Sequence, residues 1–180
     1  MTIEWKRRAR CHVLGHDVPH DGGVINFNFV TSRVTEPEKI IPALFAEVDP
    51  TLIERIKPGD YIVAGRNFLA GKAHNNGLIG MKALDLRILC ESMPYRSLRA
   101  SVGLALPSLI NCVGITSLVR DGDEIEADFA TGEVKNLTTG ETAQYPGLAR
   151  DVKVTLEQGG MKGLMAKWLE EHPELGVAAE

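Results

Sequence analysis

The sequence predicts an α/β fold built on a mixed sheet, in one domain that spans residues 1–180. Between Tyr61 and Asn111, short apolar runs alternate with stretches of helical spacing. This order favours parallel strands joined by helices. From Glu124 to Tyr145, apolar and polar residues alternate singly between glycine turns, which is typical of antiparallel strands with one solvated face. A sheet with both kinds of neighbour is mixed.

The first quarter of the chain predicts one strand and a long loop. Trp5–Leu14 is expected to form a strand, although three consecutive basic residues interrupt its alternation. His16–Asn28 is rich in turn formers and carries a Gly-Gly pair near its centre, so a loop is expected there.

Short helices are predicted next. Thr35 is a candidate N-cap, and Glu38 three residues later would complete a capping box. Pro42 falls too late to be harmless and should split the segment 36–47 into two short pieces. Thr51–Ile56 is expected to form another short helix.

The segment Lys57–Leu84 is the part around which the chain is organised. A Pro-Gly-Asp turn leads into Tyr61–Ala64, whose length and β-branched content predict a buried strand. A polar loop, Gly65–Asn76, then feeds a helix expected to begin at Asn75 or Asn76 and to end at Leu84. A helix entered from such a loop presents free backbone N–H groups, which suit a carboxylate or another anion.

The remaining elements complete the α/β order. Strands are expected at Leu86–Cys90 and Leu104–Asn111, with a helix at Tyr95–Gly103 between them. Pro107 places the second of these strands near an edge or a bend. Near the end of the chain a helix carries an apolar stripe that predicts either core packing or a subunit contact: Met161, Leu164, Met165, Trp168 and Leu169. Residues 172–180 are expected to fray.

Composition and charge exclude several classes of protein. Hydrophobic residues make up 44% of the chain and charged residues 24%, which is ordinary for a globular protein. The net charge of −4 gives no support to general nucleic-acid binding. No apolar stretch approaches the roughly 18–20 residues that a membrane span needs. The basic, polar start of the chain does not resemble a signal peptide, so a cytoplasmic location is expected.

The three cysteines, Cys11, Cys90 and Cys112, are far apart in the sequence. Their odd number and wide spacing argue against a disulfide framework and against an iron–sulfur cluster held by this chain alone. Two of them lie in apolar runs, which predicts buried, reduced thiols.

Several stretches together resemble the swivelling domain of the aconitase superfamily, and most of all the small subunit of 3-isopropylmalate dehydratase. They are Gly65-Arg66-Asn67-Phe68 followed by Gly71 and a polar cluster, Glu36-Pro37-Glu38 to Asp49-Pro50, Gly122-Asp123-Glu124 to Thr139-Gly140, and Leu156-Glu157-Gln158-Gly159-Gly160. The resemblance covers roughly residues 10–171 and implies a swivelling β/β/α domain, a mixed sheet or partial barrel flanked by helices.

The resemblance also implies a function. The chain would be the small subunit of a heteromeric hydro-lyase of leucine biosynthesis, which dehydrates and rehydrates a hydroxy-di- or tricarboxylic acid such as 3-isopropylmalate. The [4Fe-4S] cluster of such enzymes is held by a separate large subunit, so no cofactor is expected on this chain. The alternative is a non-catalytic or regulatory carboxylate-binding subunit with the same fold.

The loop departs from the family pattern at its centre. Where the family shows Gly-Ser-Ser-Arg-Glu-His, this chain has Gly71-Lys72-Ala73-His74-Asn75-Asn76. Lys72 could pair with a substrate carboxylate, and His74 could do the same or transfer a proton near neutral pH. Both are predicted as catalytic, with two solvated loop residues as the competing interpretation. The predicted substrate-binding residues are Gly71, Ala73, Asn75, Arg33 and Asp21, the last two by position in the family.

A metal site is not expected near the start of the chain. His16, Asp17, His20 and Asp21 are of ligand type, but their spacing matches no strong metal signature.

Overall fold

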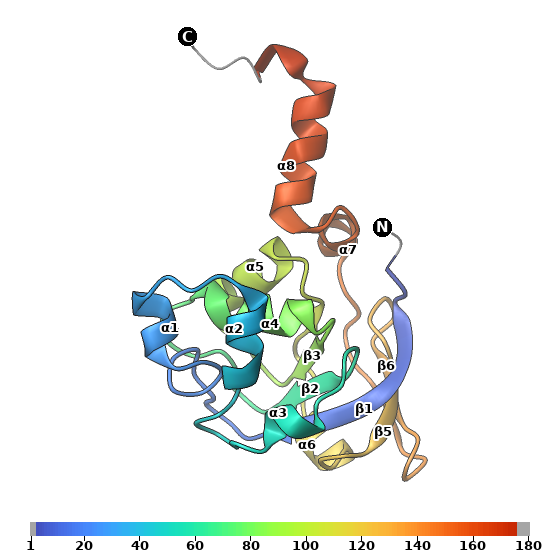
Figure 1. Cartoon of the computed structure of the whole chain (residues 1–180). Helices are drawn as coiled ribbons and strands as arrows, with labels where there is room; N and C mark the ends of the chain where they lie inside the picture. Colours follow the sequence, from blue (N-terminus) through green and yellow to red (C-terminus); the bar gives the residue numbers. More distant parts are fainter. Residues whose placement is uncertain (1–2, 176–180) are drawn as a thin grey trace.

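The computed structural model describes residues 3–175. One mixed sheet runs through it, in the strand order β4-β3-β2-β1-β5-β6-β7 (Figure 1). The pairs on the β4 side of β1 are parallel, and those on the β7 side are antiparallel. The predicted mixed α/β class is therefore confirmed. The strands are β1 (Lys6–Leu14), β2 (Tyr61–Ala64), β3 (Arg87–Cys90), β4 (Ser108–Leu109), β5 (Glu124–Asp128), β6 (Glu133–Asn136) and β7 (Thr142–Gln144).

The sheet curls into a half-barrel with a separate hydrophobic core on each face. Side chains alternate along a strand, so Ile62 and Ala64 of β2 pack in the core under the helices, and Tyr61 and Val63 pack inside the curl. All four are fully buried. A strand covered on both faces has no solvated side, which explains why its sequence is a continuous apolar run.

Helices cover the outer face of the parallel half. In Figure 1, α1, α2, α4 and α5 gather on one side of the sheet, away from β5 and β6. None of the helices in residues 3–175 combines the length and the hydropathy that a membrane span requires. The helices are α1 (Phe27–Thr31), α2 (Pro37–Ile40), α3 (Leu52–Arg55), α4 (Asn75–Ala83), α5 (Tyr95–Gly103), α6 (Ile115–Leu118), α7 (Arg150–Glu157) and α8 (Gly160–Glu171), with 3-10 turns η1 (Ile41–Ala43) and η2 (Pro173–Leu175).

Of the two helix signals predicted between Thr35 and Glu47, one is wrong and the other is confirmed. The capping box is wrong, because α2 begins after Glu36, which makes no side-chain cap, and Pro37 takes the first helical position. The prediction that Pro42 splits the segment is confirmed, since α2 ends at Ile40 and a 3-10 turn containing Pro42 follows. Proline has no N–H for an α-helical hydrogen bond and therefore ends the helix.

The central elements agree closely with prediction. The strand Tyr61–Ala64 and the helix Tyr95–Gly103 have the predicted bounds, and α4 begins at Asn75. The strand predicted over residues 104–111 is reduced to the two residues of β4, an edge strand that follows Pro107. The helix α1 begins inside the segment predicted as a loop, with Asn26 capping it by accepting a hydrogen bond from the Asn28 N–H.

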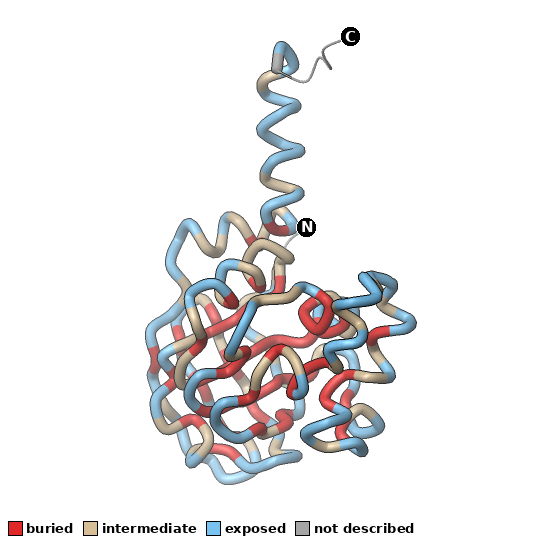
Figure 2. The backbone as a smooth tube through the Cα atoms, turned by 90° about the vertical axis from the view of Figure 1, so that its left-hand side faces the viewer, coloured by how far each residue is buried: buried red, intermediate tan, exposed pale blue. Residues whose placement is uncertain are grey.

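The C-terminal helix α8 stands away from the rest of the molecule (Figure 1) and is exposed along most of its length (Figure 2). Gly159 and Gly160, both with φ of 83°, turn the chain between α7 and α8. The predicted core packing of the apolar stripe is wrong, because Met161, Met165 and Trp168 are 41–51% exposed. The alternative, a subunit contact, stays a prediction. Of the end predicted to fray, residues 172–175 include the turn η2, and 176–180 lie outside the described residues.

Candidate functional site

Two loops meet at the edge of the sheet where the parallel strands end. The loop after β1 and the loop after β2 bind each other through Arg66, whose N–H donates to Nδ1 of His16 at 2.8 Å and whose carbonyl accepts from the Asp17 N–H at 2.8 Å. Asn67 adds a side-chain bond from Nδ2 to Oδ1 of Asp17, also 2.8 Å. Gly65 is required here, because a Cβ on it would lie 2.2 Å from Nδ1 of His16.

Four of the eight non-glycine residues with positive φ among residues 3–175 lie in the segments that meet at this edge. Asp17, Asn67 and Leu69 have φ of 55°, 57° and 60°, and Arg33 has φ of 53°. Left-handed conformations are rare for residues other than glycine, and for a bulky residue such as Leu69 they cost free energy that surrounding contacts must offset. Strain of this kind clusters at functional sites, which marks this edge as the candidate site.

The two loops stay together as they approach α4. Leu69 donates its N–H to the carbonyl of Val18 at 2.8 Å, and His20 donates its N–H to the carbonyl of Ala70 at 3.0 Å. These bonds hold the two loops side by side as far as His20 and Ala70, the residues just before Asp21 and Gly71. The loop after β1 and the Gly71–Asn76 segment therefore form one structural unit.

The centre of the site is a contact between Asp21 and His74. Oδ2 of Asp21 lies 3.3 Å from Nε2 of His74, and the side chains are 28% and 14% exposed. Nε2 of His74 and Oδ1 of Asp21 are buried, and neither has a hydrogen-bond partner among residues 3–175. The ring of Phe27 packs edge-on against the imidazole, with the centroids 6.1 Å apart. A carboxylate and an imidazole placed this way can share a proton or hold one on Nε2.

Asn76 holds a third segment against this centre. Its side chain is buried, and Nδ2 donates to the carbonyl of Phe29 at 3.2 Å and to the carbonyl of Val34 at 2.5 Å. The segment that carries Arg33 is thereby fixed beside the first turn of α4. The guanidinium itself is on the exposed surface.

The other predicted site residues surround the amino end of α4. Gly71 has φ of 85° and open space around it, and Lys72 is exposed, with no ion pair or hydrogen bond from its side chain to any described residue. Ala73 is half-buried and Asn75 is the exposed first residue of α4. His74 is the N-cap residue but gives no side-chain cap, so the first-turn N–H groups stay available to an anion.

Beneath the site lies a buried pair that sequence reasoning did not identify. His20 is 1% exposed, and its Nε2 lies 3.0 Å from Oγ of Ser97, which donates to the carbonyl of Leu69 at 2.7 Å. Burial, and to a lesser extent the nearby charge of His74, lowers the pKa of His20 to about 4. The chain separates the two partners by 77 residues, so no local pattern could reveal them. The pair supports the strained Leu69 from below.

The three cysteines are buried and free, as predicted. Burial raises the pKa of the Cys11 and Cys112 thiols to about 12 and raises that of Cys90 as well. Iron–sulfur clusters bind thiolates. Thiols held protonated in apolar surroundings do not fit that role. The described residues also contain no group of three His, Cys, Asp or Glu side chains placed to bind one metal ion.

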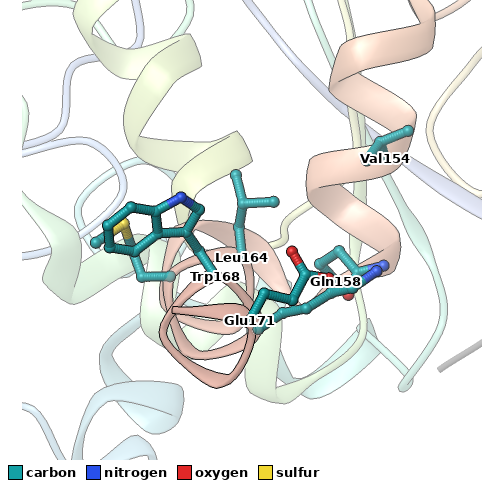
Figure 3. Close-up of a pocket in the computed structure, with 7 residues that line it drawn as sticks. Val154, Gln158, Leu164, Trp168 and Glu171 are labelled. Atoms are coloured by element: carbon teal, nitrogen blue, oxygen red, sulfur yellow. The ribbon is translucent and has the colours of Figure 1, made fainter. Parts of the chain in front are cut away.

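A large apolar hollow lies elsewhere. Figure 3 shows it between α7 and α8, lined by Val154, Gln158, Leu164, Trp168 and Glu171, with a volume of about 490 Å³. Its walls are mainly apolar, and it contains none of the predicted site residues. In the Gly71–Asn76 segment, in contrast, Gly71, Lys72 and Asn75 are exposed, whereas His74 is half-buried and Asn76 is buried.

Two curated proteins and one solved structure are similar to this chain. The chain is 36% identical over 138 residues to an isopropylmalate/citramalate isomerase small subunit of Methanocaldococcus jannaschii, covering 76% of this chain and 82% of that protein. It is 31% identical over 161 residues to a 3-isopropylmalate dehydratase small subunit of Methanopyrus kandleri, covering 89% and 92%. No family model matches the chain.

A solved structure shows the same fold. The crystal structure of a 3-isopropylmalate dehydratase from Methanocaldococcus jannaschii superimposes with a TM-score of 0.82 at 24% identity, covering 94% of this chain and 98% of that one. The half-barrel and its helices are therefore the common architecture of the two proteins.

Proposed function

Because this chain belongs to the family of 3-isopropylmalate dehydratase small subunits, which are subunits of hydro-lyases, we propose that it completes the active site of a two-subunit dehydratase. The substrate is a hydroxy-dicarboxylic acid, since the relatives are named for isopropylmalate and citramalate. The partner is a large subunit, as the small-subunit names imply. The cytoplasm is the compartment we propose, because its reducing conditions keep three free thiols reduced.

The iron–sulfur cluster belongs on the large subunit in this proposal. The cysteines of this chain are buried, and burial raises the pKa of their thiols, which disfavours the thiolates that a cluster needs. A cluster bound by the partner would supply Lewis-acid activation of the hydroxyl group that leaves. This chain supplies the opposite wall, which takes the proton and holds the carboxylates.

His74 is the residue we propose for proton transfer. Oδ2 of Asp21 lies 3.3 Å from Nε2, and its negative charge favours a proton on that nitrogen. The lone pair then resides on Nδ1, which can accept a proton from the carbon beside a substrate carboxylate. Asp21 would hold the tautomer and stabilise the imidazolium that forms. This Asp21–His74 contact is the observation that carries the proposed mechanism.

Carboxylate binding falls to the groups around the first turn of α4. The uncapped N–H groups of that turn carry partial positive charge, and the exposed Lys72, three residues before Asn75, adds an ammonium group nearby. Arg33, fixed nearby through Asn76, adds a guanidinium at the rim. Gly71, Ala73 and Asn75 shape the backbone of this cradle. Closure of the large subunit over it would exclude water and strengthen each of these interactions.

Kinetics of the complex with its large subunit test the proposal. We expect His74→Asn to lower kcat by about a hundredfold or more, because proton transfer contributes on that scale. Asp21→Asn should lower kcat by at least about tenfold and change its pH profile, because the wrong tautomer is favoured. Lys72→Ala should raise KM by roughly tenfold with little change in kcat. Lys57→Ala, an exposed lysine near the other edge of the sheet, is the matched control.

A second function is favoured by one observation. Lys72 and Ala73 occupy the positions of the two family serines, and the Lys72 side chain forms no hydrogen bond or ion pair with the described residues. This would suit a non-catalytic, carboxylate-binding subunit that regulates its partner. Full turnover of a complex that contains both Lys72→Ala and His74→Asn would reject the catalytic role and establish the regulatory one.

A further inference from the structure

A hollow of about 480 Å³ lies at the edge of the sheet opposite the Asp21–His74 contact. It is lined by the first residues of β3, the end of α4, the connection from α5 to β4 and the turn between α7 and α8. The parallel strands begin at this edge and end at the edge that holds His74. The two regions are therefore separated by the length of the strands.

The wall of this hollow contains a buried arginine without an acidic partner. Arg87 is 1% exposed, and its Nε has no hydrogen-bond partner among residues 3–175. Its Nη1 donates only a long bond of 3.5 Å to the Trp5 carbonyl, and its Cζ lies 5.7 Å from the centre of the Phe129 ring. No carboxylate of the described chain lies within 4 Å of the guanidinium. A buried cation in this state is costly unless something supplies the missing charge.

The other charges of the hollow do not neutralise Arg87. Arg7 donates from Nη1 to Oδ2 of Asp85 at 2.7 Å, which occupies that carboxylate. Lys82 is a further cation, and burial lowers its pKa. Glu4 is the remaining acidic side chain on the wall, and it forms no ion pair within the described chain. With Arg87 included, three cations face two carboxylates on this wall, so the hollow has an excess of one positive charge, that of Arg87 itself.

The rest of the wall is apolar. Leu86, Leu106, Pro107 and Leu156 are buried side chains that line the hollow. A ligand that fits this hollow must therefore combine one anionic group with a hydrocarbon body.

From these contacts we propose that the hollow is a second binding site, for a small carboxylate with an aliphatic body. The carboxylate binds the guanidinium of Arg87, and the hydrocarbon packs against Leu106, Pro107 and Leu156. An aliphatic oxo or hydroxy acid and an aliphatic amino acid share this chemistry. They differ in the ammonium group, which Glu4 can bind. The site is independent of the proposed dehydratase chemistry, because it uses none of the same residues.

Binding to the full-length chain tests the proposal by calorimetry and by methyl NMR. The probes are 4-methylpentanoate, its 2-oxo and 2-amino derivatives, and the uncharged 4-methylpentan-1-ol. We expect saturable binding of the carboxylates with a Kd of about 1 mM or tighter, and at least roughly tenfold weaker binding of the alcohol. The methyl signals of Leu106 and Leu156 should shift, and those of Leu78, a buried residue of α4, should not.

Two exposed residues provide variants that retain the fold. Lys82→Glu should weaken carboxylate binding by roughly tenfold, and Lys162→Glu on α8 is the matched control that should leave it unchanged. Glu4→Gln should strengthen binding of the oxo acid and weaken binding of the amino acid relative to it. Equal binding of alcohol and carboxylate, absence of saturation, or equal effects of the two lysine variants would overturn the proposal.

Discussion

Acidification should destabilise this protein through His20, and the size of the effect follows from its burial. Oγ of Ser97 donates its proton to the Leu69 carbonyl, so it can only accept from His20. Nε2 of the imidazole therefore carries a proton and donates it to Oγ of Ser97. A second proton would create a buried cation, and no carboxylate of residues 3–175 lies within 4 Å of it. Burial therefore lowers the pKa of His20 from 6.5 to about 4, and the nearby charge of His74 acts in the same direction.

The sign of the pH dependence follows from this shift. Between pH 6.5 and pH 4 the unfolded chain binds a proton at His20 that the folded chain does not bind, so the free energy of unfolding increases with pH in this window. The contribution is complete above about pH 6.5 and is lost as the pH falls toward 4. At 1.36 kcal/mol per pKa unit, the total loss is about 3 kcal/mol, of which roughly 2.5 kcal/mol has disappeared by pH 4.5.

Urea unfolding at intervals from pH 7.5 to 4.5 measures this loss. Carboxylates also titrate near the acidic limit, so the informative quantity is the difference between the wild-type chain and His20→Gln, which retains an N–H donor for Ser97. The variant should lose about 2.5 kcal/mol less than the wild type over this range. His172→Gln, at the end of α8, should behave as the wild type does. Parallel loss of stability in the wild type and His20→Gln would refute the reasoning.

Two further substitutions test how α4 is held in place. Asn76→Ala should lower the free energy of unfolding by about 2 kcal/mol and raise KM in the complex, because the carbonyls of Phe29 and Val34 lose their donor; an unchanged urea midpoint would contradict this. Gly80→Ala should destabilise the chain by roughly 1–3 kcal/mol, because the new Cβ would lie 2.7 Å from a side-chain atom of α2. Gly15→Ala, where nothing lies within 4 Å, is its control and should change stability by less than about 1 kcal/mol.

The sequence predicts best those elements whose signal is local and redundant. The run Tyr61–Ala64 is apolar at every position because both faces of β2 are covered. A run of this length is typical of a strand and too short for a typical helix. The helix Tyr95–Gly103 follows Pro94 and carries its apolar residues at helical spacing, so its bounds were predictable. The change to single alternation after Glu124 likewise predicts the antiparallel half of the sheet.

The errors arise where one pattern fits two environments. The apolar stripe of α8 has the same spacing whether the helix is packed or free, and only the turn at Gly159 directs it away from the body. Thr35 and Glu38 had the composition of a capping box, yet Pro37 fixed the start of α2 one residue later. Short-range rules cannot decide between such competing signals.

The candidate site was predictable as a loop but not as a set of contacts. Position in the family pattern selected Asp21 and His74 separately, and the structure brings them within 3.3 Å. The pairing of His20 with Ser97 had no sequence signal, because its partners lie on elements that meet only after the sheet forms. Distances across the fold depend on the strand order, which composition does not encode.

The position of β1 at the centre of the sheet has a consequence for how the protein is made. This strand leaves the ribosome before the other strands of the sheet, and its antiparallel neighbour β5 follows it by more than a hundred residues, with Arg8 bonded to Glu124 across a separation of 116. Until that neighbour is translated, one edge of β1 is an unpaired template for association with other chains. The strand carries three arginines and a lysine, and their positive charges would repel the same strand of another nascent chain during synthesis.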